Sequence, residues 1–190
     1  MTRDDYLRDP VVAQVLSDGE TDDRRWLTQQ AAELESPVVV QVGASSDAAI
    51  ASWAALAPAH FVVVDPNTSH ARRALEQRVS AFLTYRGGRY TRVRSLGEGS
   101  RALDLLTGVL GERKPSVICM ELEEPRLTDL QLSYLTMTGS DGLGLLHCPD
   151  NPIDDEAFRD VWTKVCGLPP WVYSGCPARP SLNVASITRE

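Results

Sequence analysis

The residues best placed to do chemistry stand at the ends of two short apolar runs. The first run, Val38 to Gly43, ends in a glycine, and the second, Phe61 to Asp65, ends in a carboxylate about 20 residues after the first turn. A glycine permits a tight turn and lets a ligand approach the backbone. A carboxylate at this spacing can accept hydrogen bonds from ribose hydroxyls. Together the two ends predict a nucleoside-containing ligand, although each alone is also what a plain turn and a plain helix start would show.

The elements that position these ends alternate along the chain. Strand–helix alternation favours right-handed crossovers and a mostly parallel sheet covered on both faces, so an α/β fold is expected. The last two strands lack a full helix between them, which predicts an antiparallel C-terminal edge. Such sheets bind ligands outside the carboxyl ends of their strands. Strands are expected over 38–43, 61–65, 90–94, 116–121, 143–148, 171–174 and 183–188, and helices over 47–57, 68–83, 100–112, up to about 138 and from 151.

Length and charge narrow the class of protein. The 190 residues and 20.8 kDa suit one domain over 37–190 with a helical extension over 1–36, a flexible tail being the alternative for residues 1 to about 9. The net charge of −7 argues against a nucleic-acid or anionic-lipid partner. No apolar run approaches the roughly 20 residues that span a bilayer, and the N-terminus lacks a signal-peptide core, so a cytoplasmic protein without a membrane partner is expected.

The glycine pattern indicates which nucleoside to expect. A dinucleotide fingerprint requires G-x-G-x-x-G to bring the backbone against a pyrophosphate. Here Ser45 and Ala48 replace its second and third glycines, and no Walker phosphate loop is present. A ligand without a pyrophosphate fits better, and S-adenosylmethionine is the common one.

At this point the chain resembles the class I S-adenosylmethionine-dependent methyltransferases over about residues 37–190. VQVGASSD looks like their glycine motif, FVVVDPN like their acidic second motif, TRVRSLGEGSRALDLL like the adenine-lining stretch, and SVICMELEEP like the fourth strand. The resemblance implies a three-layer Rossmann-like fold with a mostly parallel seven-stranded sheet, and S-adenosylmethionine as the cofactor.

Site residues follow from the same resemblance. Many members carry an acidic residue two positions before the first glycine, where this chain has Gln41, which could bind an amino group but lacks the charge to pair with it. Asp65 would hold the ribose. The other implied cofactor residues are Gly43, Ala44 and Ser45 at the methionine moiety, Pro66 and Asn67 beside the ribose, and Ser95, Leu96 and Gly97 beside the adenine.

Candidate catalytic groups are Glu121, Glu123 and His147, near predicted strand ends on the ligand side. Each could take a proton from a hydroxyl or amine acceptor. The alternatives are a solvated loop for Glu123 and a packed histidine for His147. A divalent metal is disfavoured, because no Asp ends the fourth strand and no later Asp-Asn pair is obvious.

The remaining reactive, aromatic and basic side chains are expected to have structural roles. The four cysteines suit buried free thiols, and a zinc site of His147, Cys148, Cys166 and Cys176 lacks the usual spacing. Trp53 and Trp162 fall on inner helix faces. The basic cluster Arg86, Arg89, Arg92 and Arg94 is expected on the solvated face of an edge strand, where it discourages edge pairing. Binding of phosphate or RNA is the alternative.

The leading interpretation is methyl transfer from S-adenosylmethionine to a small-molecule hydroxyl or amine. The alternative is a methyltransferase-like domain without catalysis that serves as a partner-binding or structural subunit. A different nucleotide-using enzyme is disfavoured by the missing glycines. A homodimer is compatible with the sequence.

Overall fold

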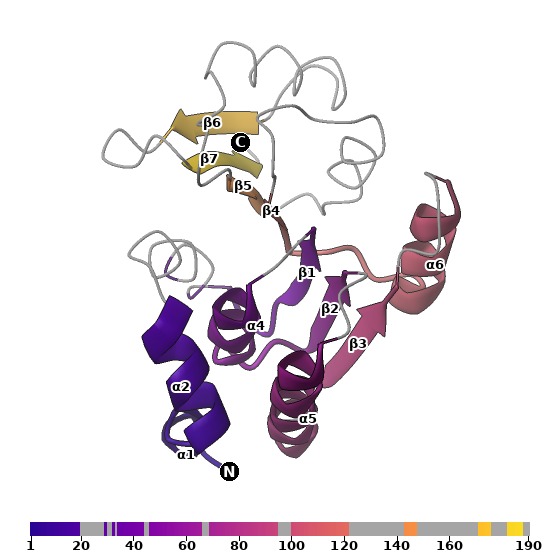
Figure 1. Cartoon of the computed structure of the whole chain (residues 1–190). Helices are drawn as coiled ribbons and strands as arrows, with labels where there is room; N and C mark the ends of the chain where they lie inside the picture. Colours follow the sequence, from indigo (N-terminus) through magenta and orange to yellow (C-terminus); the bar gives the residue numbers. More distant parts are fainter. Residues whose placement is uncertain are drawn as a thin grey trace.

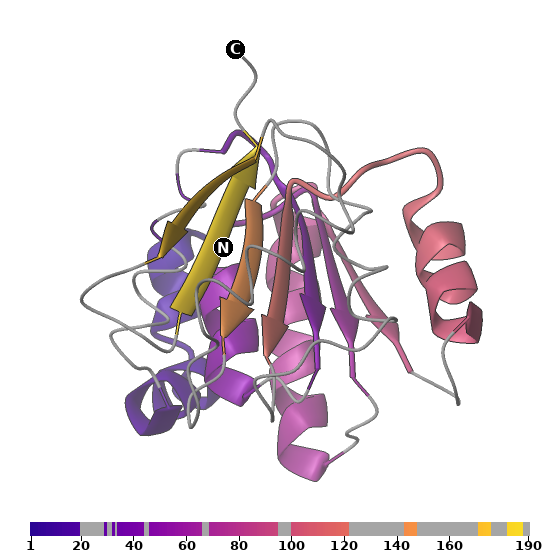
Figure 2. The same cartoon turned by 90° about the horizontal axis from the view of Figure 1, so that it is seen from above.

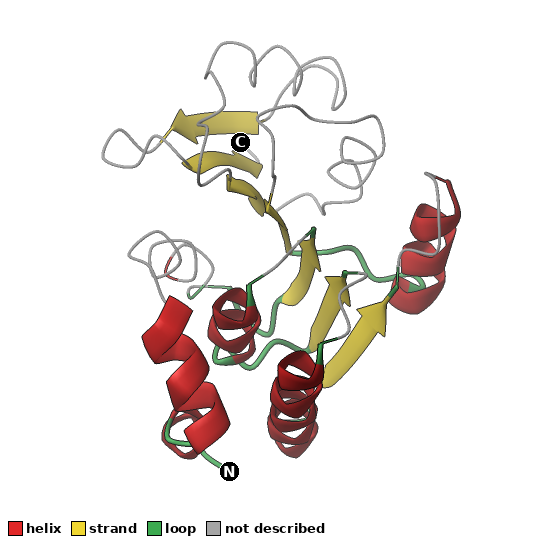
Figure 3. Cartoon of the chain, in the orientation of Figure 1, coloured by secondary structure: helices red, strands yellow, loops and turns green. Residues whose placement is uncertain are grey.

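A computed structural model describes residues 1–19, 29, 32, 34–43, 46–65, 69–94, 100–121, 143–147, 171–175 and 182–187. Helices and strands alternate through most of this chain (Figures 1 and 3). The helices are α1 (Arg3–Leu7), α2 (Pro10–Gly19), α4 (Asp47–Ala54), α5 (His70–Tyr85) and α6 (Ser100–Leu110). The strands are β1 (Val38–Val42), β2 (His60–Val64), β3 (Arg89–Val93), β4 (Val117–Glu121), β5 (Leu143–His147), β6 (Trp171–Gly175) and β7 (Leu182–Ile187).

The strands pair side by side in the order β3-β2-β1-β4-β5-β7-β6 (Figure 2). β3, β2, β1, β4 and β5 are parallel to one another, with Val42 of β1 opposite Val64 of β2 on one side and Met120 of β4 on the other. β7 runs antiparallel to β5 and to β6. The predicted α/β class with a parallel sheet is therefore confirmed. The chain moves outward from β1 in one direction and then in the other, so β1 and β4 flank the switch in strand order.

β1 and β2 are buried strands because most of their residues are apolar on both faces, the buried polar exceptions being Gln41 and His60. Every residue of β2 is buried, as are all of β1 except Val38. Side chains alternate between faces along a strand, so Val39, Phe61 and Val63 face one side, where they join the main apolar cluster. Continuous β-branched runs of this kind are typical of parallel strands covered on both sides.

Helices α2, α4 and α5 cover that side of the sheet (Figure 1). α4 is rich in alanine and buried along most of its length, which lets it lie close to its neighbours. Trp53 is buried there, as expected for a core residue. α4 ends at Ala54, earlier than the predicted Ala57, because Ala57 has a left-handed φ of 50°.

The N-terminal helices belong to the same core. Tyr6 is buried, its ring stacks on Phe82 at a centroid distance of 4.4 Å, and its hydroxyl donates to the Ala51 carbonyl at 3.2 Å. The flexible-tail alternative for residues 1–9 is therefore wrong. Residues 20–28 of the expected helical extension lie outside the described residues, and α1 and α2 both precede them. Among the described helices, none is long and apolar enough to cross a membrane.

The packing of Tyr6 predicts a measurable stability effect. Tyr6→Ala should lower the free energy of unfolding by about 3–5 kcal/mol, because it removes a buried aromatic ring and leaves a cavity against Phe82. Tyr6→Phe should cost about 1 kcal/mol, because the Ala51 carbonyl still accepts a bond from the Ala55 amide. Urea unfolding measures both. The control is Tyr85→Ala, at a side chain 69% exposed, and an equal loss there would contradict the packing argument.

Candidate functional site

The carboxyl ends of four parallel strands meet at one level of the sheet. Val42, Val64, Met120 and Leu146 form a row of register partners. The next position along each strand is therefore Gly43, Asp65, Glu121 and His147. The last two are direct register partners. Four residues predicted from widely separated parts of the sequence thus share one edge, at the switch in strand order where open α/β sheets bind ligands.

Gly43 makes the turn at the end of β1. Its φ of 106° lies in the region that favours glycine, and its amide donates to the Val64 carbonyl at 3.1 Å. The chain then enters α4, whose first turn is capped by Ser46 through a bond from the Ala49 amide at 3.1 Å. The turn places the N-terminus of α4 beside the end of β2, which is the arrangement that a backbone-contacting ligand needs.

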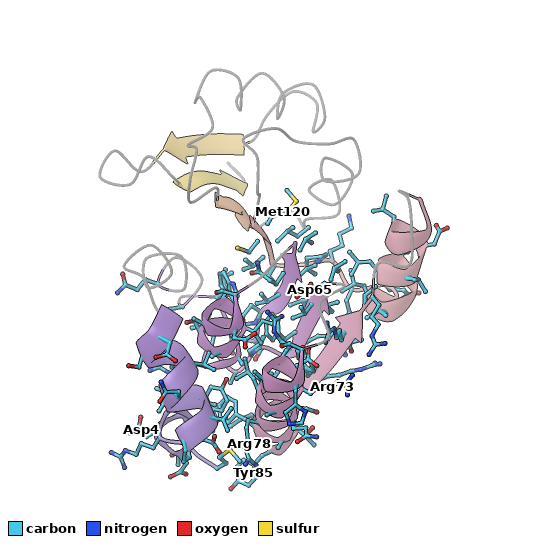
Figure 4. The ribbon with its side chains drawn as sticks, viewed as in Figure 1. Asp4, Asp65, Arg73, Arg78, Tyr85 and Met120 are labelled. Carbon is cyan, nitrogen blue, oxygen red and sulfur yellow. The ribbon has the colours of Figure 1, made fainter. Side chains whose placement is uncertain are left out.

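Asp65 is buried and ion-paired. The residue is 1% exposed, and its Oδ2 accepts from Arg72 Nη1 at 2.8 Å. Arg72, also 1% exposed, pairs through Nε with Asp47 at the start of α4. Figure 4 shows Asp65 in the interior, whereas Arg73 and Arg78 of α5 lie toward the outside. The predicted ribose-binding carboxylate is therefore part of an Asp47–Arg72–Asp65 cluster, in which Arg72 and Asp65 are buried and Asp47 is partly exposed.

A second arginine holds the backbone of Asp65. Arg92 donates to the Asp65 carbonyl from Nη2 at 3.2 Å and to Glu76 Oε1 from Nη1 at 2.9 Å. Tyr90 donates to the same Glu76 oxygen at 3.0 Å, and burial, with the Glu76 charge next, raises the pKa of Tyr90. Arg92 was expected on a solvated face. That expectation is wrong, because period-two alternation directs Arg92 with Tyr90 toward α5.

Gln41 is a buried amide without a partner. It is 0% exposed, and neither its Nε2 nor its Oε1 has a hydrogen-bond partner in the part of the chain that the structure describes. Its register partners are Val63 and Cys119, whose side chains are apolar or weakly polar. An unsatisfied buried amide costs roughly 1–3 kcal/mol. Two unused donors and two unused acceptor sites of this kind fit a polar ligand group at the end of β1.

The other predicted residues divide into two groups. Glu121 and His147 are adjacent at the backbone level, at the ends of β4 and β5. The predictions at Ala44, Ser45, Pro66, Asn67, Ser95, Leu96, Gly97 and Glu123, and at Trp162 and three of the cysteines, fall outside the described residues. Cys119 is buried, as expected. Across the described ranges, no group of three or more His, Cys, Asp or Glu side chains could hold a metal ion.

The burial of Arg72 and its ion pair with Asp47 were not predicted from the sequence. Ala71 is exposed, and the buried stripe of α5 is Arg72, Leu75, Val79, Phe82 and Leu83. The signal was present in the spacing, since positions 72, 75 and 79 follow the i, i+3, i+7 rule. A charged residue on an apolar stripe requires a buried partner, and the nearby acidic strand end supplies one.

Similarity to solved structures identifies the fold of this chain. No family model and no curated protein matches the sequence. Among solved structures, the TDP-rhamnose 3′-O-methyltransferase of calicheamicin biosynthesis matches with a TM-score of 0.64 and 13% identity, over 95% of this chain and 89% of its own. An O-methyltransferase from Bacillus cereus in complex with S-adenosylhomocysteine matches with a TM-score of 0.58 and 11% identity, over 98% and 96%.

A third match is the O-methyltransferase TomG from Streptomyces achromogenes, involved in tomaymycin synthesis and solved with S-adenosylmethionine. It has a TM-score of 0.53 and 13% identity, over 96% of this chain and 91% of its own. Identities this low bear on architecture alone. The sheet order, the glycine turn after β1 and these likenesses agree that the chain has the fold of the class I S-adenosylmethionine-dependent methyltransferases.

Proposed function

We propose that this protein binds S-adenosylmethionine and transfers its methyl group to the hydroxyl or amine of a small molecule. The observation that carries the proposal is the placement of Gly43 and Asp65 at adjacent strand ends, on one row of the sheet beside the β1–β4 switch. The proposed unit is residues 37–190, a three-layer fold with an antiparallel edge, preceded by the helical extension of residues 1–36. A soluble cytoplasmic enzyme fits this unit.

The described residues fit the proposed cofactor. The unpartnered Gln41 amide could bind the amino or carboxylate group of the methionine moiety, and the Gly43 turn would let that moiety approach the backbone. The Asp65 carboxylate would accept from the ribose hydroxyls. Residues 95–97 would flank the adenine, and Ala44, Ser45, Pro66 and Asn67 would complete the wall.

The acceptor would lie over β4 and β5. These strands are two and three positions from β2, so their ends are roughly 10–15 Å from Asp65 at the usual strand spacing. Bound S-adenosylmethionine supplies an electrophilic methyl group. Glu121, Glu123 or His147 would take the proton of the acceptor as its oxygen or nitrogen attacks, and the surrounding residues would align the acceptor for in-line displacement. The matched structures named as O-methyltransferases favour an oxygen acceptor.

One observation favours the second candidate, a partner-binding domain without catalysis. The carboxylate that would bind ribose is already paired with Arg72, and Gln41 lacks the negative charge that many of the family carry there. A chain that had lost cofactor binding could keep such a cluster for stability. Cofactor binding therefore separates the two functions.

Calorimetric titration of the purified protein is the direct test. S-adenosylmethionine and S-adenosylhomocysteine should both bind with dissociation constants well below millimolar, whereas NAD should not bind, because the chain lacks the pyrophosphate-binding glycines. If neither adenosyl ligand binds at millimolar concentration, the methyltransferase proposal is wrong and the partner-binding candidate takes its place.

Asp65→Asn tests the ribose contact. The substitution keeps the shape of the side chain but removes its charge, so it should weaken S-adenosylhomocysteine by about 1.5–3 kcal/mol, the range for hydrogen bonds to charged groups. Titration calorimetry measures the change. Asp104→Asn on the exposed side of α6 is the matched control and should leave affinity unchanged. An unaltered affinity in Asp65→Asn would remove Asp65 from the cofactor site.

Gln41→Met separates binding from stability. Removal of the unpartnered amide should raise the free energy of unfolding by about 1–3 kcal/mol, because a buried polar group without a hydrogen bond is lost. The same change should weaken S-adenosylhomocysteine. Urea unfolding and calorimetry measure the two effects, with exposed Gln77→Met as the control. Reduced stability in Gln41→Met would show that the amide has a structural partner.

A further inference from the structure

The environment of Arg72 is unusual for an arginine in a helix. Its amide donates to the side chain of the N-cap residue Ser69 at 3.2 Å, which places Arg72 in the first turn of α5. A positive charge there opposes the helix dipole. The guanidinium is also buried, which removes most of its hydration. Both costs are offset by the carboxylates of Asp65 and Asp47, so the position of Arg72 depends on these two partners.

The two carboxylates belong to the two strand–helix turns of the proposed cofactor site. Asp65 ends β2, and Asp47 begins α4 directly after the Gly43 turn. Arg72 therefore joins the ribose side of the site to the methionine side through one side chain. The Asp47 side chain is 29% exposed, whereas that of Asp65 is 1% exposed, so the cluster reaches solvent from the α4 end.

A second arginine, Arg92, acts on the backbone of Asp65. Arg92 binds the Asp65 carbonyl through Nη2 and Nε at 3.2 and 3.4 Å, and Glu76 holds Arg92 in place. The carbonyl and the carboxylate of Asp65 are thus each fixed by a different arginine. This leaves Asp65 with one orientation, which is what a carboxylate needs if it is to receive a ribose at little entropic cost.

We propose that Arg72 is a positioning residue for ribose recognition. Its guanidinium holds the Asp65 carboxylate in the orientation that accepts the ribose hydroxyls, and it ties this orientation to the start of α4 through Asp47. The inference rests on the proposed cofactor site. Arg72 itself need not touch the cofactor.

The test is a thermodynamic cycle between Arg72 and the ribose hydroxyls. Calorimetry compares S-adenosylhomocysteine with its analogue lacking the 2′- and 3′-hydroxyls, on the native protein and on Arg72→Lys. The variant should bind S-adenosylhomocysteine at least about tenfold more weakly, since lysine cannot contact both carboxylates in the arginine geometry. The analogue lacking these hydroxyls should already bind the native protein weakly, and Arg72→Lys should reduce its affinity little further. A coupling of this size is the signature of a shared interaction.

Other outcomes overturn the inference. An unchanged or improved affinity in Arg72→Lys, or an equal loss for both ligands, would show that Arg72 serves the fold alone. Absence of binding to the native protein would instead reject the proposed function, so the two failures are distinct. Arg73→Lys, one residue along and exposed, is the matched control and should bind both ligands as the native protein does.

Folding of the variant is checked separately. Arg72→Lys keeps the charge, and circular dichroism with urea unfolding reports whether the variant is folded. If it is not, Asp47→Ala carries the same cycle, because Asp47 is partly exposed and anchors the other side of the guanidinium. It should weaken S-adenosylhomocysteine selectively by about two- to tenfold, as expected for loss of one partly exposed charged partner. Equal effects on both ligands would again overturn the inference.

Discussion

A buried guanidinium between two carboxylates links the elements on which the candidate site depends. Arg72 from α5 pairs with Asp65 at the end of β2 and with Asp47 at the start of α4. None of these groups could be buried alone, because an isolated charge in the interior is strongly disfavoured. The cluster therefore requires that α4, α5 and β2 keep their relative positions. Removing Arg72 would leave two carboxylates without the guanidinium between them, and removing either carboxylate would leave Arg72 with one of these two ion pairs, which is why such clusters constrain structure even where they add little net stability.

The sheet supplies the second constraint. β1 is paired in parallel with both β2 and β4, so the ends of three strands reach the same edge. Helices α2, α4 and α5 cover one side, and Tyr6 joins the N-terminal helix to them. This arrangement buries the apolar residues of β1 and β2 and places Gly43 and Asp65 at adjacent strand ends. Gln41 departs from the pattern, because it is polar and buried and its amide has no hydrogen-bond partner among the described residues. Departures of that kind are typical of functional positions, where a local cost is retained for binding.

The fold was largely predictable because periodicity and glycine placement are local signals. Val38–Val42 and His60–Val64 are β-branched runs of strand length, and the alternation of strands with helices implied the parallel sheet. Asp65 was identifiable as a polar residue at the end of such a run. Arg72 was not, because a charged residue near a helix start usually lies on the surface. Its burial depends on partners 7 and 25 residues away in the sequence.

The sequence by itself determined the class of fold and the residue types at the carboxyl ends of the parallel strands. These follow from patterns within short segments, which the chain carries whatever its tertiary structure. Only the tertiary structure decided which groups neutralise one another. Asp65 pairs with Arg72, Arg92 turns inward to Glu76, and the Gln41 amide finds no hydrogen-bond partner within the described ranges. Ionic and hydrogen-bond partners depend on distances between segments, and packing sets those distances.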